Sequence, residues 1–309
     1  MELFHHQTKI DFMGMRKITA VFSVVICAIS LFFLFTKGLN FGLDFTGGTQ
    51  LELRYHTPVS IEEVRHHLEQ ANFNGVKVAQ YGSAKDVIVK LANIEGITEQ
   101  ELGQKVVEVL KQQDPDIELR RVEFVGSEVG DRLAEQGTLA VIVALIATMI
   151  YIAVRFEWRF GVSAAVALLH DPIIILGIFA YFQIEFDLAT LAGVLAVIGY
   201  SLNDTIVVYD RVRENFRKVR KGNTEEIMNL SINQTLSRTI MTSCLTLLVV
   251  VALYIFGGES LNGFSLSLIV GIVIGTYSSI FVAGALALVM GLSRQDLLPS
   301  SKKVVDDMP

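Results

Sequence analysis

The sequence has few cysteines and none of the short patterns that mark common catalytic sites. Its two cysteines, Cys27 and Cys244, both lie inside apolar runs and indicate no disulfide framework. No Walker A loop, metal-ligand spacing or nucleophile elbow occurs along the chain. We therefore expect no enzyme activity, no cofactor and no bound metal. Any work that the protein performs then draws on an ion gradient or on a partner.

A strong charge of either sign is also missing. The formal net charge is −6 over 309 residues, which argues against nucleic acid as a main partner. Hydrophobic residues make up 51% of the chain, a fraction that alone does not distinguish membrane proteins from soluble ones. Their distribution does, because apolar runs of roughly 18 to 28 residues recur, and each is long enough to span a bilayer.

Six such runs predict a polytopic α-helical membrane protein. The predicted transmembrane helices cover residues 18–36, 138–154, 161–182, 188–209, 238–256 and 264–291, so that 138–291 holds the second to the sixth. The first run ends in bulky residues, unlike the cleavage site of a signal peptide, and is expected to remain as a helix. The third is expected to be interrupted near its middle at His170, Asp171 and Pro172.

Basic flanking residues predict the orientation in the membrane. Lys and Arg cluster before the first run and after the second, fourth and sixth, whereas the turns after the third and fifth have none. By the positive-inside rule, residues 1–17, a loop at 210–237 and a tail at 292–309 are cytoplasmic. The segment 38–136 then lies in the periplasm of a Gram-negative cell, and the expected location is the inner membrane.

The segment 38–136 predicts an α+β domain between the first and second transmembrane helices. Strand patterns occupy residues 49–55, 76–81, 87–91 and 117–125, and helix patterns occupy 60–71 and 98–112. Both helices open with a predicted capping box, Ser60 with Glu63 and Thr98 with Glu101. The resulting order βαββαβ is that of a ferredoxin-like domain.

A stripe of small residues runs along the sixth predicted helix. Every fourth position is small: Ser267, Gly271, Gly275, Ser279, Ala283, Ala287 and Gly291. Small residues let membrane helices approach closely, so we expect the fourth, fifth and sixth helices to pack together. Arg238, Thr242 and Thr246 are expected to face this seam from the fifth helix. A purely structural seam without a transport role would carry the same stripe.

Asp204 is a carboxylate inside the fourth predicted helix, beside Asn203. Such a group costs about 2.5 to 3.5 kcal/mol on insertion scales. Arg238 opens the fifth helix from the same side at comparable depth, and an ion pair would satisfy both charges. The pattern indicates a proton site at which Asp204 alternates between paired and protonated states. The alternatives are a static ion pair, or an Arg238 that extends to the membrane interface.

Further polar groups are candidates for a proton relay. His170 and Asp171 lie near the middle of the third helix, and Asn203 adjoins Asp204. Ionisable residues in membrane helices often mark such relays. The alternative for His170 and Asp171 is a hydrogen-bonded kink before Pro172 with a packing role.

Five stretches resemble the SecD/SecF family of protein translocase subunits and together extend over nearly the whole chain. They are 38–49 (GLNFGLDFTGGT), 125–130 (VGSEVG), 201–215 (SLNDTIVVYDRVREN), 235–243 (TLSRTIMTS) and 271–279 (GIVIGTYSS). The stretch 201–215 is similar to the SecF form of its motif. Two departures are small, since Tyr209 stands where the family often has Phe and Cys244 lies where Thr and Ser are usual.

The resemblance implies a subunit of the RND-like superfamily that pairs with SecD in the membrane. It implies work beside the SecYEG channel and YajC, with the proton-motive force promoting late steps of preprotein export. By the family's motif, Asp204 is the proton-linked carboxylate and Arg238 its charged partner. The domain at 38–136 corresponds to the small periplasmic head of the family.

Three other functions compete with this one. A passive scaffold for SecD would use Asp204 only structurally. Half of an RND-type exporter of lipids or small molecules predicts a ligand-sized apolar pocket and a larger periplasmic part. An intramembrane aspartyl protease would need Asp171 and Asp204 within a few ångströms of each other.

Overall fold

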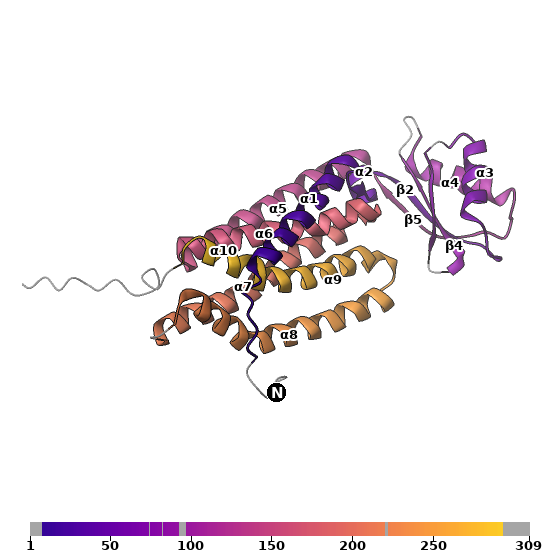
Figure 1. The fold of residues 1–309 in the computed structure, drawn as a ribbon. Helices are drawn as coiled ribbons and strands as arrows, with labels where there is room; N and C mark the ends of the chain where they lie inside the picture. The colour runs from indigo at the N-terminus through magenta and orange to yellow at the C-terminus, as the bar shows by residue number, and fades with distance from the viewer. Residues whose placement is uncertain (1–7, 74, 82, 93–96, 220–221, 293–309) are drawn as a thin grey trace, which may run out of the picture.

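The structure, a computed structural model, places a small α+β domain beyond one end of a bundle of long helices (Figure 1). It describes residues 8–73, 75–81, 83–92, 97–219 and 222–292. Within these ranges, six helices are long and apolar enough to cross a membrane. The predicted polytopic membrane protein is therefore confirmed. Residues 1–7 and 293–309, which include nearly all of the predicted tail, lie outside the described residues.

The six spans are longer than most of the apolar runs that predicted them. They are α1 (Arg16–Thr36), α5 (Ser127–Arg155), α6 (Trp158–Phe182), α7 (Leu188–Lys218), α8 (Thr224–Phe256) and a composite last span. The last span joins α9 (Asn262–Tyr277), the π-helical segment η2 (Ser278–Ala283) and α10 (Gly284–Val289). A short 3-10 turn, η1 (Glu259–Leu261), precedes it.

The predicted loop at 210–237 is mostly helical, which corrects that expectation. α7 continues to Lys218, and α8 begins after Asn223. Glu214 bonds Lys218 one turn further on at 2.5 Å, and Asn223 opens α8 with a capping box. Such pairs and caps support turns whose apolar side chains are buried in the core of the bundle, among them Val212, Phe216 and Met228. Residues 127–136, which the sequence assigned to the segment 38–136, also form the first turns of α5, where Arg132 donates to Glu128.

The interruption predicted in the third span is also wrong. α6 runs as one helix from Trp158 to Phe182 with Pro172 inside it. A proline removes one backbone hydrogen bond, but a membrane helix tolerates it where neighbouring helices and side chains stabilise the local backbone. His170 and Asp171 therefore project from an unbroken helix.

The α+β domain, called here the head (residues 48–125), has the predicted ferredoxin-like topology. Its elements are β2 (Gly48–Arg54), α3 (Ile61–Gln70), β3 (Lys77–Tyr81), β4 (Ser83–Leu91), α4 (Glu99–Lys111) and β5 (Glu118–Val125). The antiparallel strands lie in the order β3-β4-β2-β5. Leu51 and Val89 of the sheet are fully buried with Leu68 and Leu102 of the helices, so both helices cover one face.

One of the two predicted capping boxes is present in the head. Thr98 and Glu101 make both reciprocal bonds at the start of α4. Ser60 has the extended backbone of an N-cap residue before α3, but its side chain makes no capping bond. The second box is therefore a correction, although the helix begins at the predicted place.

The seam between α7 and α9 depends on small residues. A Cβ at Gly271 would lie 2.1 Å from Val197 Cγ2, and one at Gly193 would lie 2.0 Å from Ser267 Oγ. Ser279 is fully buried within η2. The close approach of the two helices therefore requires glycine at these positions.

The fifth span meets this seam through a different face from the predicted one. Ser243 Oγ of α8 lies 2.7 Å from Thr276 Oγ1 of α9, and Tyr200 of α7 donates to Ser243 at 3.2 Å. Arg238 and Thr242 are exposed on the outer side of α8. The expected stripe of Arg238, Thr242 and Thr246 is thus corrected to a stripe one residue further along the helix.

Candidate functional site

Asp171 lies at the centre of a buried polar cluster in the bundle. Its side chain is 1% exposed. Ser201 Oγ donates to Asp171 Oδ2 at 2.5 Å, Ser278 Oγ donates to the same oxygen at 2.9 Å, and His170 Nδ1 lies 2.9 Å from Oδ1. Both serine hydroxyls donate to the carboxylate, and the imidazole also donates in the tautomer that carries its hydrogen on Nδ1. The cluster joins α6 to α7 and to the last span.

Two features of the last span bring its backbone to this carboxylate. A Cβ at Gly275 would lie 3.0 Å from Ser201 Cβ and 3.5 Å from Asp171 Oδ2, so glycine leaves room for both. Ser278 is the first residue of the π-helical segment η2. Single π turns within α-helices are frequent at functional sites.

His170 extends the cluster toward the first span. Its ring is 5% exposed and stacks near the ring of Tyr277 at 6.3 Å between centroids. The Tyr277 hydroxyl donates to the Thr19 carbonyl at 2.9 Å and lies 2.9 Å from Ser23 Oγ. His170 Nε2 is buried without a hydrogen-bond partner in the described part of the chain. This nitrogen therefore has an unused hydrogen-bonding position within the described bundle.

Asp204 has the opposite surroundings. It lies on α7 almost one turn beyond Ser201 and is 3% exposed. Its Oδ2 atom has no hydrogen-bond partner among the described residues, and none of their basic groups pairs with it within 4.0 Å. Because buried polar groups are normally paired, this carboxylate is an exception that needs an explanation.

The predicted ion pair between Asp204 and Arg238 is not formed in the structure. Arg238 is on the exposed side of α8, and its charge reaches Asp204 only at longer range. Where apolar residues occur on several faces of a helix, its sequence does not show which face packs against the neighbouring helices. The predicted pair between Asp204 and Arg238 depended on that choice. Among the described residues, Asp204 and Arg238 thus lie on α7 and α8 without an ion pair between them.

The sequence-predicted relay residues divide into two groups. His170 and Asp171 are joined in the polar cluster, whereas Asn203 is exposed on the outer side of α7 and apart from it. Three further residues of the cluster, Ser201, Ser278 and Tyr277, were not predicted from the sequence. Their signal was present in two of the quoted motifs, where hydroxyl residues interrupt apolar helices.

The charged residues at the other end of α7 form a network at the bundle's edge. Arg155 donates to both oxygens of Asp210 at 3.1 Å, and Arg213 lies 3.4 Å from Glu157. These groups are partly exposed. The network joins the end of α5 to α7, and exposed pairs of this kind contribute little to stability.

Two further chemistries find no support in the geometry. Among the described residues, no three His, Cys, Asp or Glu side chains gather where they would hold a metal ion. None of the hydrogen bonds of Asp171 leads to Asp204. The hydroxyl of Ser201, rather than a second carboxylate, faces Asp171.

The fold and site together define a polytopic membrane protein with a small α+β head and titratable groups inside the bundle. A family model described as "Protein export membrane protein SecD/SecF, C-terminal" matches residues 105–293, and the "SecD/SecF GG Motif" model matches residues 32–59. The first of these covers more than half of the chain. The chain therefore belongs to the SecD/SecF family.

Individual relatives agree with this assignment. A protein named "Protein translocase subunit SecF" from Vibrio alginolyticus is 48% identical over 96% of this chain and 95% of its own length. The protein of that name from Pseudomonas aeruginosa is 46% identical over 97% and 98%. A crystal structure of SecDF, a translocon-associated membrane protein from Thermus, matches 93% of this chain with 36% identity and a TM-score of 0.84. The chain spans 39% of that longer SecDF chain.

Proposed function

We propose that the chain works with SecD in the inner membrane, where it uses the proton-motive force to promote late steps of preprotein export. The observation that carries the proposal is the buried Asp204 carboxylate, whose Oδ2 atom has no partner among the described residues. A buried carboxylate without a partner is costly in its charged form, because that form needs a counterion. Asp204 therefore suits a site that takes up and releases a proton.

Arg238 supplies the counterion in the second state. With Asp204 ionised, the guanidinium turns inward and pairs with it; with Asp204 protonated, the two separate, as they are separated here. One charge that crosses 100 mV releases about 2.3 kcal/mol. That energy biases a two-state equilibrium roughly fifty-fold. The transfer of one proton thus biases the position of α7 against α8 by this factor.

A partner in the membrane is part of this proposal. Asn203, Arg238 and Thr242 are exposed on the outer side of α7 and α8. Lipid tails offer no hydrogen bonds, and a charged Arg in a membrane helix normally faces protein or water. This polar face is where the helices of SecD are expected to pack. Its exposure here favours a subunit over a protein that functions alone.

The remaining parts of the proposal follow the family. The head lies in the periplasm, both termini are cytoplasmic, and SecYEG, YajC and the moving preprotein are the further partners. Membrane lipid surrounds the rest of the bundle. No catalytic step, cofactor or nucleic acid has a role, because a protonated carboxylate and a moving helix are sufficient.

The test is the completion of preprotein export in inverted membrane vesicles that contain the chain with SecD at matched expression. Asp204→Asn is expected to abolish the gradient-dependent part of export, because the amide cannot change charge at neutral pH. Asp210→Asn is the matched control, since it removes an acid two turns further along α7 whose ion pairs are partly exposed. Its response to the gradient is expected to match the wild type.

Two outcomes distinguish a proton-driven motor from a passive scaffold. Loss of the gradient response in Asp204→Asn, with the complex with SecD still assembled, supports the motor. Full gradient-dependent export in that variant would show that Asp204 and Arg238 are structural, and the chain would then act as a passive scaffold for SecD.

A further inference from the structure

The glycine-rich stretch 38–49 has no part in the proton site, yet it makes the contacts that connect the head to the bundle. Its first segment, β1 (Asn40–Phe41), pairs in parallel with β6 (Glu185–Phe186), the strand just before α7. Gly42 N–H donates to the Phe186 carbonyl at 2.9 Å, and Asn40 Nδ2 donates to the Gln183 carbonyl at 3.0 Å. The stretch is therefore attached to the connection between α6 and α7.

Asp44 makes the contact that reaches α7 itself. It lies in the single turn α2 (Leu43–Thr46), and its Oδ2 atom accepts from the Leu188 N–H at 2.9 Å. Leu188 is the first residue of α7, and its N–H has no acceptor within that helix. A carboxylate at this place also complements the helix dipole. Asp44 thus caps the helix that carries Asp204 from a different part of the chain.

We call the contacts between the stretch 38–49 and the bundle the joint. Gly47 and Gly48, which follow Asp44, contact the second span and the sheet. A Cβ at Gly47 would lie 3.0 Å from Ser127 Cα in α5, and one at Gly48 would lie 2.4 Å from the Leu91 carbonyl oxygen. Both glycines have a positive φ, +65° and +133°. On α5, a Cβ at Gly130 would lie 2.9 Å from Gly47 N. The turn is thus packed tightly against the start of the second span and the end of β4.

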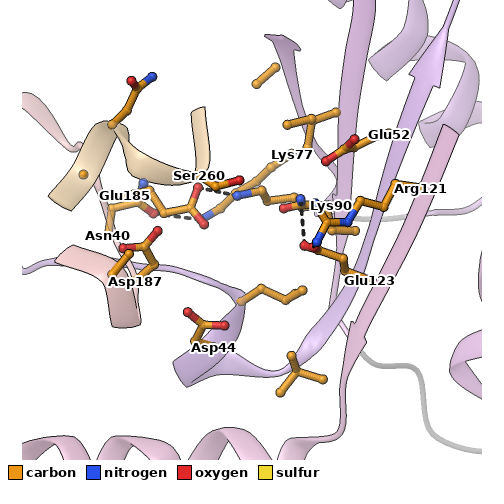
Figure 2. A pocket seen from close by; sticks show the side chains of 18 of the residues that line it. Asn40, Asp44, Glu52, Lys77, Lys90, Arg121, Glu123, Glu185, Asp187 and Ser260 are labelled. Carbon is orange, nitrogen blue, oxygen red and sulfur yellow. Dashed lines mark hydrogen bonds and ion pairs between the residues drawn. The ribbon is translucent and has the colours of Figure 1, made fainter. Parts of the chain in front are cut away.

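Side chains of the sheet complete the attachment. Lys90 of β4 forms an ion pair with Glu185 of β6, and Lys77 Nζ of β3 donates to Asn40 Oδ1 at 2.9 Å. Beside these contacts, an open cavity of about 1030 Å³ lies between the sheet and the bundle. Figure 2 shows Asn40 and Glu185 on the bundle side of this cavity, with Glu52 and Arg121 on the sheet opposite. The head is held at the joint and not by a broad packed interface.

We propose that Asp44 is a positioning residue that fixes the head to the first turn of α7, so that a movement of α7 is transmitted to the head. Asp204 lies 16 residues beyond Leu188, about 24 Å along the helix at 1.5 Å per residue. A rotation or shift of α7 at the proton site then displaces its capped end. The inference rests on the proposed proton-driven function and names the contact by which that function reaches the head.

Substitutions at Asp44 test the joint in the same vesicles. Asp44→Ala removes the acceptor for Leu188 N–H and is expected to lower gradient-dependent export about fivefold, the factor for loss of one capping bond. Asp44→Asn is expected to keep it, because Asn caps helices as well as Asp does. Asp187→Ala is the matched control: it removes the other cap of α7, to Thr190 N–H, and leaves the head contact.

The results at Asp44 are decisive in either direction. A selective loss in Asp44→Ala, with rescue in Asp44→Asn and a normal response in Asp187→Ala, supports the joint. Wild-type gradient response in Asp44→Ala would overturn it. An equal loss in Asp187→Ala would also overturn it, because any damage to the end of α7 would then be sufficient.

A disulfide across the joint tests whether β1 and β6 remain paired during export. Asn40 and Glu185 are neighbours in register, and cysteines on adjacent strands about 4.8 Å apart are within reach of a disulfide. With Cys27 and Cys244 replaced by Ala, the Asn40→Cys, Glu185→Cys chain is expected to export at least as well oxidised as reduced, because the disulfide replaces the contacts that Asn40 and Glu185 make with Lys77 and Lys90. Export that stops on oxidation and returns on reduction would show that the joint must open, which contradicts a rigid connection.

The same double-cysteine variant separates this inference from the proposed function. If Asp204→Asn keeps its gradient response, the motor proposal fails whatever happens at Asp44. The yield of the disulfide, measured without any gradient, still reports on the joint. A lower yield when Asp44→Ala is added supports the positioning role, and an unchanged yield contradicts it.

Discussion

Asp171 and Asp204 are both almost fully buried in the same helical bundle, at 1% and 3% exposure, but they differ in their hydrogen bonds. Asp171 accepts from two serine hydroxyls and lies against an imidazole nitrogen. Asp204 has an oxygen without a partner among the described residues. Burial is therefore common to both, and hydrogen-bond donors distinguish them. A carboxylate with donors fixes helices, and one without donors is available to change state.

The two carboxylates are connected through α7. Ser201, which donates to Asp171, precedes Asp204 by three residues on the same helix. Residues three apart lie on neighbouring positions of a helix face. The bond from Ser201 thus sets the rotation of α7 and with it the direction in which Asp204 points. Asp171, which has hydrogen-bond partners, thus positions Asp204, whose Oδ2 atom has none among the described residues.

The largest expected effect comes from replacing the unsatisfied carboxylate by an apolar residue. Asp204→Leu is expected to stabilise the purified chain by about 3 kcal/mol, because it removes a group whose insertion cost is of that order. Reversible unfolding in detergent micelles measures the change. Asp204→Asn should stabilise it less, since its amide is still polar. A destabilised Leu variant would mean that Asp204 has partners and that the contrast with Asp171 is false.

Widening the helix seam should disturb Asp171 without touching either carboxylate. Gly271→Ala places a Cβ 2.1 Å from Val197 Cγ2, so α7 and α9 must separate, at an expected cost of roughly 2 to 3 kcal/mol. The same unfolding assay measures the loss. Gly199→Ala, also on α7, is the control, because nothing lies within 4 Å of its added Cβ. That control should be neutral or slightly stabilising through helix propensity.

Replacing Asp171, the carboxylate with hydrogen-bond partners, should change the stability of the chain in the opposite direction from replacing Asp204. Asp171→Leu removes the acceptor of three polar contacts, although the Ser278 hydroxyl also reaches the Gly275 carbonyl at 3.2 Å, and is expected to destabilise the chain by up to about 2 kcal/mol, from roughly 0.6 kcal/mol for each membrane hydrogen bond. Asp171→Asn, which keeps one acceptor oxygen, should recover part of the loss. Equal stability of the Leu variant and the wild type would show that the cluster does not hold the helices together.

Several predictions from the sequence agree with the structure because they depend on local patterns. Six apolar runs were long enough to span a membrane, and the period-two and helical patterns of the head gave its βαββαβ order. The capping box at Thr98 and Glu101 also formed as predicted. Helix ends were less predictable, since α7 and α8 continue through polar residues that the apolar pattern excluded.

The contacts between helices could not be predicted in the same way. α8 carries polar residues on more than one face near its middle, so two polar stripes, one through Arg238 and Thr242 and one through Thr239 and Ser243, were compatible with its sequence. The bond between Ser243 and Thr276 shows which one faces the seam. The cap that Asp44 provides for Leu188 joins residues 144 positions apart, and no local pattern indicates it.

The sequence by itself determined which segments cross the membrane, the topology of the head and the identity of the two buried carboxylates, because hydrophobic length and side-chain periodicity are local properties. Only the tertiary structure decided that Asp171 is satisfied, that Asp204 and Arg238 are apart, and that Asp44 holds α7. These depend on which helix faces meet, and in an apolar medium that choice is made by close packing and by single hydrogen bonds between distant residues.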